Sequence, residues 1–265
     1  MKGRYEIMKK MLSLICAAIM LLTLAIGVAE APAFTTIEPG KLIISTSPDF
    51  PPFEYTDDEG NIIGIEPDLI ALICEKLGLE LEILPMDFDS ALLAAQTGKT
   101  DAVVSGVTCN GEVGEARRLI FDFTVPYASI TQAIVCKEGA EITMENLGSK
   151  VIGVQRGTTG EIYVSEDFGE KNVIAYDTYS LVFQALKNGQ VDCIVMDDTV
   201  AKAYVASMLD MKLVIAPTTY EPEDFAFGIF KKDTGLCDAI SAALQELIDD
   251  GTVNQIILKY NSEEE

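Results

Sequence analysis

Residues 182–197 read VFQALKNGQVDCIVMD, and this stretch repeats a pattern that residues 91–106 show as ALLAAQTGKTDAVVSG. In both stretches a helical segment ends at a glycine, and an aspartate three residues later opens a short apolar run typical of a buried strand. The two glycines are Gly98 and Gly189. The repeat predicts that the chain holds two similar α/β units.

The ends of the two predicted strands carry the polar groups of the repeat. In open α/β sheets, ligands bind beyond the carboxyl ends of the parallel strands. Residues 105–108 (SGVT) occupy that place in the first unit, and Asp197 and Asp198 occupy it in the second. A cleft between two facing units would bring these groups together. Asp101 and Asp192 stand before their strands, so turn or capping roles are expected for them.

The rest of the chain alternates strand-type and helix-type segments, which is typical of α/β proteins with largely parallel sheets. KLIIST (41–46) reads as a strand. EPDLIALICEKLG (66–78) reads as a helix with a proline in its first turn and a glycine at its end. VQRGTTGEI (154–162) predicts a turn that leads into a helix, whose free backbone N–H groups can face an anion.

The N-terminus differs from the rest of the chain. Four basic residues precede an apolar run over 11–26, and small residues follow it at 27–29. This pattern predicts an export signal over 1–29. An uncleaved membrane anchor is the alternative, although a run of 16 residues falls short of the ~20 that a bilayer core requires. Both readings predict an exported protein, periplasmic or extracellular, which would be membrane-tethered if the signal is not cleaved.

The charge balance and the residue types exclude several function classes. Without residues 1–29 the chain keeps 15 basic and 41 acidic side chains, and a net charge of −26 would repel nucleic acid. The chain has no histidine, so neither a histidine-dependent protease nor a Cys/His zinc site is expected. Five cysteines remain without close pairs, which favours small buried side chains over a disulfide framework. No metal and no cofactor are predicted.

A free amino acid suits the polar groups at the strand ends, because it carries both a carboxylate and an ammonium group. Its carboxylate is best bound by a guanidinium and backbone N–H donors, which Arg117 or Arg118 and the turn at 158–159 can supply. Its ammonium group needs a fixed carboxylate. Asp197 is predicted for that role, and Asp198 is predicted to cap the following helix.

Several motifs, taken in order, resemble the periplasmic or extracellular solute-binding proteins of polar amino acid ABC transporters (solute-binding protein family 3). The matching stretches are TSPDFPPFEYTDDEGNIIGIEPDL, FDSALLAAQTGKTDAVVSGVT, FDFTVPY, IGVQRGTTGEIY, NGQVDCIVMD and ELIDDGTVNQIILKY. The resemblance implies a two-lobed clamp of type II, in which each lobe is a mostly parallel sheet flanked by helices. It implies lobe 1 over 34–127 and 226–265, lobe 2 over 128–225, and hinge segments near 128–132 and 218–225.

The resemblance also implies a ligand site. By their places in the motifs, the expected ligand-binding residues are Ser47, Phe50, Phe88, Ser105, Gly106, Thr108, Arg117, Gln155, Thr158, Thr159 and Asp197. The two phenylalanines would cover the ligand from either side, although each also fits as an ordinary core aromatic.

The arginine is where the sequence departs from the family pattern. The family's Thr-x-x-Arg element is replaced by a longer stretch, with Gly114 where the threonine is expected. Counting back from Phe123 selects Arg117, and Arg118 stays the alternative. The longer, glycine-bearing stretch is read as a loop that would loosen the grip on the ligand carboxylate.

A second departure concerns specificity. Relatives that take basic amino acids, and some that take polar ones, place an acid where this chain has Ser47. A serine cannot neutralise a cationic side chain, so a neutral polar ligand is expected. Surface or capping roles are expected for Glu54, Glu66 and Asp68.

The sequence thus predicts a monomeric, non-catalytic receptor that captures an amino acid and delivers it to an ABC permease in the membrane. Enzymes such as cyclohexadienyl (arogenate/prephenate) dehydratases use the same clamp and are the alternative. Such an enzyme needs a general acid near its substrate, and Glu161 is the candidate. The place of Glu161 after the anion-binding turn is better explained as a first-turn helix acid. A sensor input domain, the third reading, is normally fused to further domains.

Overall fold

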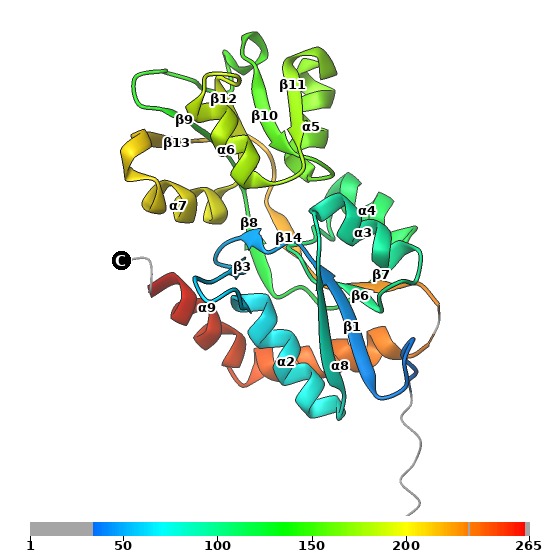
Figure 1. Ribbon diagram of the computed structural model, residues 1–265. Helices are drawn as coiled ribbons and strands as arrows, with labels where there is room; N and C mark the ends of the chain where they lie inside the picture. The colour runs from blue at the N-terminus through cyan, green and yellow to red at the C-terminus, as the bar shows by residue number, and fades with distance from the viewer. Residues whose placement is uncertain (1–33, 233, 263–265) are drawn as a thin grey trace, which may run out of the picture. The chain divides into compact units, whose positions relative to one another are not determined.

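Figure 1 shows the computed structural model, which describes residues 34–232 and 234–262. The predicted export signal, 1–29, lies outside the described residues. Within the described ranges, none of the helices has the length and apolar character needed to cross a membrane. The described part is built on two five-stranded sheets, one in each lobe.

Lobe 1 contains the sheet with the strand order β5-β1-β6-β15-β7. Its strands are β1 (Lys41–Thr46), β5 (Glu80–Pro85), β6 (Ala102–Val103), β7 (Phe121–Phe123) and β15 (Gly228–Phe230). A smaller sheet consists of β2 (Asp49–Phe50), β3 (Glu54–Thr56) and β4 (Ile62–Ile63). The helices are α2 (Ile65–Leu77), α3 (Phe88–Gln96), α4 (Gly111–Arg118), α8 (Leu236–Asp249) and α9 (Thr252–Ser262). In the main sheet, β15 runs antiparallel to both of its neighbours, and β1 pairs in parallel with β5 and β6.

Lobe 2 contains the sheet with the strand order β11-β10-β12-β9-β13. Its strands are β9 (Gln132–Lys137), β10 (Ile152–Gln155), β11 (Val173–Tyr176), β12 (Cys193–Asp197) and β13 (Leu213–Pro217). Its helices are α5 (Thr159–Phe168), α6 (Tyr179–Lys187) and α7 (Asp198–Ser207), with short 3-10 helices at Leu147–Ser149, Glu170–Asn172 and Leu209–Met211. Here β9 is the strand that runs antiparallel to both of its neighbours.

The two sheets share one plan, which confirms the repeat predicted from the sequence. In each sheet, three parallel strands are followed by one antiparallel strand and an edge strand. The repeated glycines Gly98 and Gly189 have φ angles of 72° and 70°, a conformation that glycine adopts without a Cβ penalty. Asp101 accepts the backbone N–H groups of Ile37, before β1, and Ile43, within it, and Asp192 accepts one just before β10. Their structural roles are the expected ones.

Two strands connect the lobes. β8 (Ala128–Ile130) leads from lobe 1 to lobe 2, β14 (Glu223–Phe225) leads back, and the two pair in antiparallel fashion (Figure 1). The antiparallel strand of each sheet, β9 or β15, follows directly after its connecting strand. The predicted hinge segments include these two connecting strands, whereas the boundaries proposed for the lobes stay a prediction.

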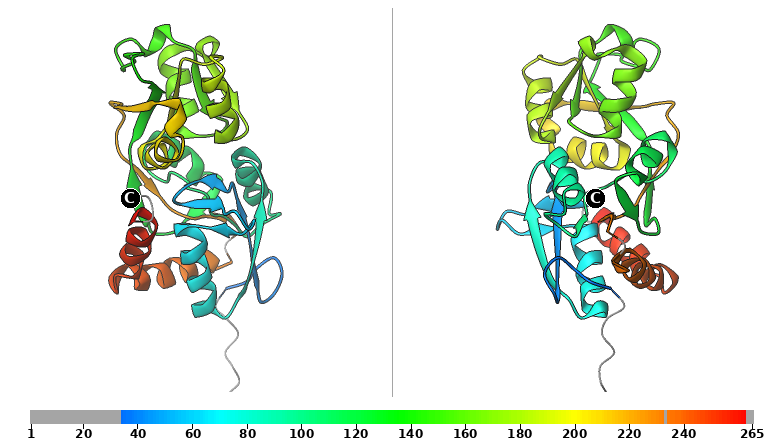
Figure 2. Two further views of the ribbon diagram at one scale, coloured as in Figure 1. Left: turned by 60° about the vertical axis from the view of Figure 1, so that its left-hand side comes forward. Right: turned by 90° about the vertical axis from the view of Figure 1, so that its right-hand side faces the viewer.

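The C-terminal helices complete lobe 1. In both views of Figure 2, α8 (orange) and α9 (red) lie on lobe 1, and both contact α2. Leu69, Ile70 and Ile73 of α2 are fully buried in the resulting core. Gly78 ends α2 in the left-handed conformation, as the sequence predicted.

The stretch before Arg117 is a helix, so its interpretation as a loosening loop is wrong. Residues 111–118 form α4, and Gly114 packs directly on the backbone of Cys109. A Cβ atom at position 114 would lie 2.5 Å from the carbonyl oxygen of Cys109, closer than any side chain permits. The glycine therefore seats α4 against the strand-end segment.

The cysteines in the described ranges are free thiols. Cys74, Cys109, Cys136 and Cys193 are buried, and Cys237 is half-buried. Burial raises the pKa of Cys193 to about 12. This confirms the interpretation of the cysteines as small buried side chains.

Candidate ligand-binding site

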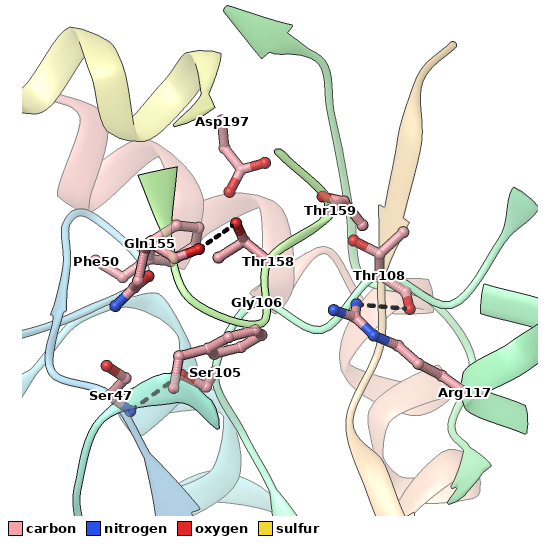
Figure 3. Close-up of a pocket in the computed structure, with 11 residues that line it drawn as sticks. Ser47, Phe50, Ser105, Gly106, Thr108, Arg117, Gln155, Thr158, Thr159 and Asp197 are labelled. Carbon is pink, nitrogen blue, oxygen red and sulfur yellow. Dashed lines mark hydrogen bonds between the residues drawn. The ribbon is translucent and has the colours of Figure 1, made fainter. Parts of the chain in front are cut away.

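One cavity is lined from both lobes, and all eleven predicted site residues line it. Lobe 1 contributes Ser47, Phe50, Phe88, Ser105, Gly106, Thr108 and Arg117, and lobe 2 contributes Gln155, Thr158, Thr159 and Asp197. In Figure 3, Asp197 lies on the side of the cavity opposite Ser47 and Ser105. The structure thus brings the predicted residues together, and their role in binding stays a prediction.

The strand end of lobe 1 is held by close packing and hydrogen bonds. Gly106 has a φ of 56°, and a Cβ atom there would lie 2.5 Å from Cε1 of Phe50, so the ring of Phe50 requires glycine. The hydroxyl of Ser105 accepts from the backbone N–H of Ser47 at 3.0 Å and donates to Glu54 at 2.7 Å. The groups that line this side of the cavity are therefore fixed without a ligand.

Arg117 reaches the cavity from the last turn of α4. Its guanidinium donates to the carbonyl oxygen of Thr108 at 3.3 Å and to that of Gly157, in lobe 2, at 3.1 Å. It also lies over the ring of Phe88, 5.8 Å from the ring centroid. Burial lowers the pKa of Arg117 to about 10, so the group stays charged at neutral pH. Part of its donor capacity remains available to an anion, because a guanidinium has five N–H groups.

Arg118 has a different environment. It is exposed, and its guanidinium lies over the ring of Phe123, 5.3 Å from the centroid, outside the cavity. The count back from Phe123 therefore selected the arginine that lines the cavity.

The start of α5 forms the anion-facing turn that the sequence predicted. The hydroxyl of Thr158 accepts the N–H of Glu161 at 3.2 Å, and the Glu161 carboxylate accepts the N–H of Gly157 at 2.6 Å. This reciprocal capping fixes the turn with Thr158 and Thr159 against the cavity. Glu161 is thus engaged in holding the backbone, as its reading as a helix acid expected.

Asp197 and Asp198 have different roles at the start of α7. Asp197 is buried, makes no side-chain cap, and accepts a short hydrogen bond from the Gln132 amide. Asp198 was predicted to cap the helix, but it is the first residue of α7, where it accepts the backbone N–H of Thr131 and pairs with Lys202 at 2.6 Å. Burial raises the pKa of Asp197 well above its usual range, and repulsion from Glu223 adds to the shift.

Glu223 is a buried acid bonded to cavity-lining residues, and the sequence reasoning missed it. It lies in β14, is 2% exposed, and accepts hydrogen bonds from the Thr108 hydroxyl at 2.6 Å and the Gln132 amide at 3.0 Å. The same amide nitrogen reaches Asp197 and Thr159. The only sequence signal was the position of Glu223 in a predicted hinge segment, where an acid is ordinarily solvated.

Glu54 and Glu66 are also buried, so the surface and capping roles expected for them are wrong. Both are fully buried: Glu54 accepts from Ser105, and Glu66 accepts from the backbone N–H of Gly106 at 2.9 Å and from the Tyr127 hydroxyl. Burial raises the pKa of Glu54 well above its usual range, and repulsion from Glu66 adds to the shift. Asp68, in contrast, pairs with Lys259 at the surface, as expected.

The arrangement can bind a small molecule with charges of both signs. A guanidinium and a helix N-terminus offer donors to an anion, and a buried carboxylate offers an acceptor to a cation. Among the described residues, no group of three or more acidic or cysteine side chains could hold a metal ion.

Comparison with known proteins places this geometry in context. Residues 42–263 match the sequence profile of the bacterial extracellular solute-binding proteins, family 3. The arginine-binding extracellular protein ArtP of Bacillus subtilis (strain 168) is 32% identical over 224 residues, which cover 83% of this chain and 86% of that protein.

Solved structures agree with the sequence matches. Holo ArgBP from T. maritima is 37% identical, with a TM-score of 0.72 over 79% of this chain and 91% of that one. An ancestral arginine-binding protein bound to glutamine is 37% identical, with a TM-score of 0.78 over 84% of this chain and 98% of that one. At 37% sequence identity, both comparisons indicate a shared family as well as a shared fold.

Proposed function

Because the chain belongs to the bacterial extracellular solute-binding proteins, family 3, we propose that it is an exported monomer that holds a free amino acid between its lobes and delivers it to an ABC permease. The observation that carries the proposal is the placement of Arg117 and Asp197, from different lobes, on one buried cavity. A single amino acid can satisfy both charges, and neither lobe satisfies both ends of it alone.

The ligand orientation follows from the donors and acceptors. The carboxylate faces Arg117 and the start of α5. There the Thr159 hydroxyl accepts from the Gln132 amide and keeps its own hydrogen for the ligand, whereas the Thr158 hydroxyl already donates to the carbonyl oxygen of Gln155. The ammonium group faces Asp197, whose charge is destabilised by burial when no cation is near. The ligand side chain is left to the wall that contains Ser47 and Gln155.

A cationic side chain is favoured by the acids next to the cavity, of which Asp49 lies behind Ser47 and Gln155. Four carboxyl groups are hydrogen-bonded directly to cavity-lining residues: Asp49, Glu54, Glu66 and Glu223. Arg117 alone among the cavity-lining residues carries a positive charge. The expectation of a neutral ligand rested on Ser47 only. Burial raises the pKa of Asp49, Glu54 and Glu66, and a cationic side chain beside these buried acids would stabilise their charged forms. Arginine, named for several relatives, is the ligand that we propose.

The competing enzyme hypothesis depends on Glu161 acting as a general acid. Its carboxylate accepts the Gly157 N–H and holds the turn, which supports a structural role. We therefore propose a binding protein without catalytic activity.

Thermal-shift screening tests these proposals together. The panel contains the twenty common amino acids, prephenate and arogenate. A ligand at 100 times its Kd adds about 2.7 kcal/mol to the free energy of unfolding. Arginine is expected to give a larger shift than glutamine, serine or glutamate. Stabilisation by neutral amino acids alone would restore the neutral-ligand reading, and mass spectrometric detection of a product from prephenate or arogenate would favour the enzyme.

A further inference from the structure

We propose that Asp49 is a closure latch, a lobe 1 residue that binds three elements of lobe 2 and sets how long the lobes stay closed on a ligand. The importance of the latch for ligand release rests on the proposed function, whereas its effect on lobe opening does not. Asp49 does not line the cavity, so it does not touch the ligand. Its charge still belongs to the acids proposed to favour a cationic side chain, and amide exchange without ligand separates the latch from that effect.

The contacts of Asp49 join lobe 1 to three separate elements. Its carboxylate accepts the backbone N–H of Tyr179, at the start of α6, at 2.7 Å, and the side-chain amide of Gln155, in β10, at 3.4 Å. Its backbone oxygen accepts the hydroxyl of Tyr204, in α7, at 2.7 Å. Within lobe 1, the Ser47 hydroxyl donates to the same carboxylate at 3.0 Å and fixes its direction.

The start of α6 is capped from two lobes. Thr178, the helix's own N-cap, accepts the N–H of Leu181. Asp49 accepts the N–H of Tyr179, another of the groups that have no partner inside a helix. A negative charge is favoured at a helix N-terminus, so closure places Asp49 where lobe 2 best binds an anion. Opening would return both groups to water.

Aromatic packing makes the same interface rigid. The ring of Phe50, next to Asp49, stacks on that of Tyr179 with 6.0 Å between centroids. Tyr204 stacks on Phe183, inside lobe 2, at 4.4 Å. Tyr204 is therefore held inside lobe 2 by Phe183, and Tyr179 is held at the interface by Phe50. A rigid partner loses little entropy on closure, so these bonds contribute to the closed state.

Ligand dissociation measures the latch directly. Radiolabelled L-arginine is bound to the protein and chased with unlabelled L-arginine. Asp49→Ala is expected to raise the dissociation rate 10- to 100-fold while changing the association rate less than about 3-fold, since most interface effects appear in dissociation. The matched control is Thr178→Ala, which removes the other cap of the same helix end without touching lobe 1. Its dissociation rate is expected to stay within about 3-fold of the wild-type rate.

Amide hydrogen exchange at Tyr179, followed by NMR without ligand, provides a readout that does not depend on arginine binding. Tyr204→Phe removes the bond to the backbone oxygen of Asp49 and also the bond between Tyr204 and Ser180 inside lobe 2. It should raise the exchange of the Tyr179 amide if the bonds to Asp49 close one interface, whereas Ser180→Ala, which removes only the second bond, should leave that exchange unchanged. Tyr204→Phe also replaces Asp49→Ala if the latter fails to fold. Unchanged Tyr179 exchange in Tyr204→Phe would overturn the latch, as would an Asp49→Ala protein with wild-type dissociation. If the wild-type protein binds no arginine, the ligand proposal fails, and the exchange experiment still decides the latch.

Discussion

Replacing Asp197 by asparagine should affect ligand binding and ligand-free stability in opposite directions. The carboxylate is buried, and its pKa is raised by burial and by Glu223, so its charge is unfavourable without a bound cation. Asparagine keeps an oxygen that can accept from Gln132 while it removes the charge. The ligand-free variant should therefore unfold at the same or a higher denaturant concentration than the wild-type protein.

The loss of affinity can be placed on a scale. Removing one partner of a buried, hydrogen-bonded charge pair costs about 2 to 5 kcal/mol, because the other charge is left buried and unpaired. At 1.4 kcal/mol for each factor of ten, L-arginine should bind about 30- to 4,000-fold more weakly. Repulsion between Asp197 and Glu223 in the ligand-free protein favours the upper part of this range, since the ligand ammonium relieves it.

Isothermal titration calorimetry with L-arginine measures this change, and urea unfolding measures the stability. Asp198→Asn is the matched control, because it changes the neighbouring acid, which is half-buried and pairs with Lys202 outside the cavity. The control should lose less than about 1 kcal/mol of binding free energy. Unchanged affinity in Asp197→Asn, or equal losses in both variants, would refute the assignment of the ammonium site.

Three further outcomes follow from the same geometry. Arg117→Met should lose about 2 to 5 kcal/mol of binding free energy and Arg118→Met less than about 1 kcal/mol in calorimetry, and the reverse ranking would exclude the assigned carboxylate site. Gly106→Ala should lower the free energy of unfolding by at least ~1–2 kcal/mol through its left-handed backbone, with further loss from the contact with Phe50; an unchanged urea midpoint would contradict the packing. Arginine affinity should rise with pH, because the raised pKa leaves Asp197 partly protonated below that pKa and binding then releases a proton. Calorimetry in buffers of different ionisation enthalpy should detect this release, and proton uptake would contradict the charge assignment.

The repeat made much of the fold predictable. Residues 91–106 and 182–197 share a helix, a left-handed glycine and a strand, and these local signals were strong enough to predict two units with the same plan. The sequence also predicted that Arg117 lines the cavity, because its distance along the chain from Phe123 fits the family motif. The helix before it was not predicted, since glycines at 111 and 114 argue against helix unless tertiary packing requires them.

The buried acids could not be predicted because their burial depends on long-range contacts. Glu54 sits in a short strand and Glu66 in a first helical turn, and both places are usually solvated. They are brought together at Gly64, where a Cβ atom would lie 2.3 Å from the carbonyl oxygen of Phe53. Glu223 is buried by the pairing of β14 with β8, about which the local sequence says little.

Equilibrium dialysis of the purified protein against radiolabelled L-arginine tests the central claim most directly. The account predicts one molecule retained per chain, displaced by unlabelled arginine and kept in the presence of excess glutamate, whose side-chain carboxylate would lie beside buried acids. Absence of any retained arginine, in a protein that still unfolds cooperatively in urea, would contradict it.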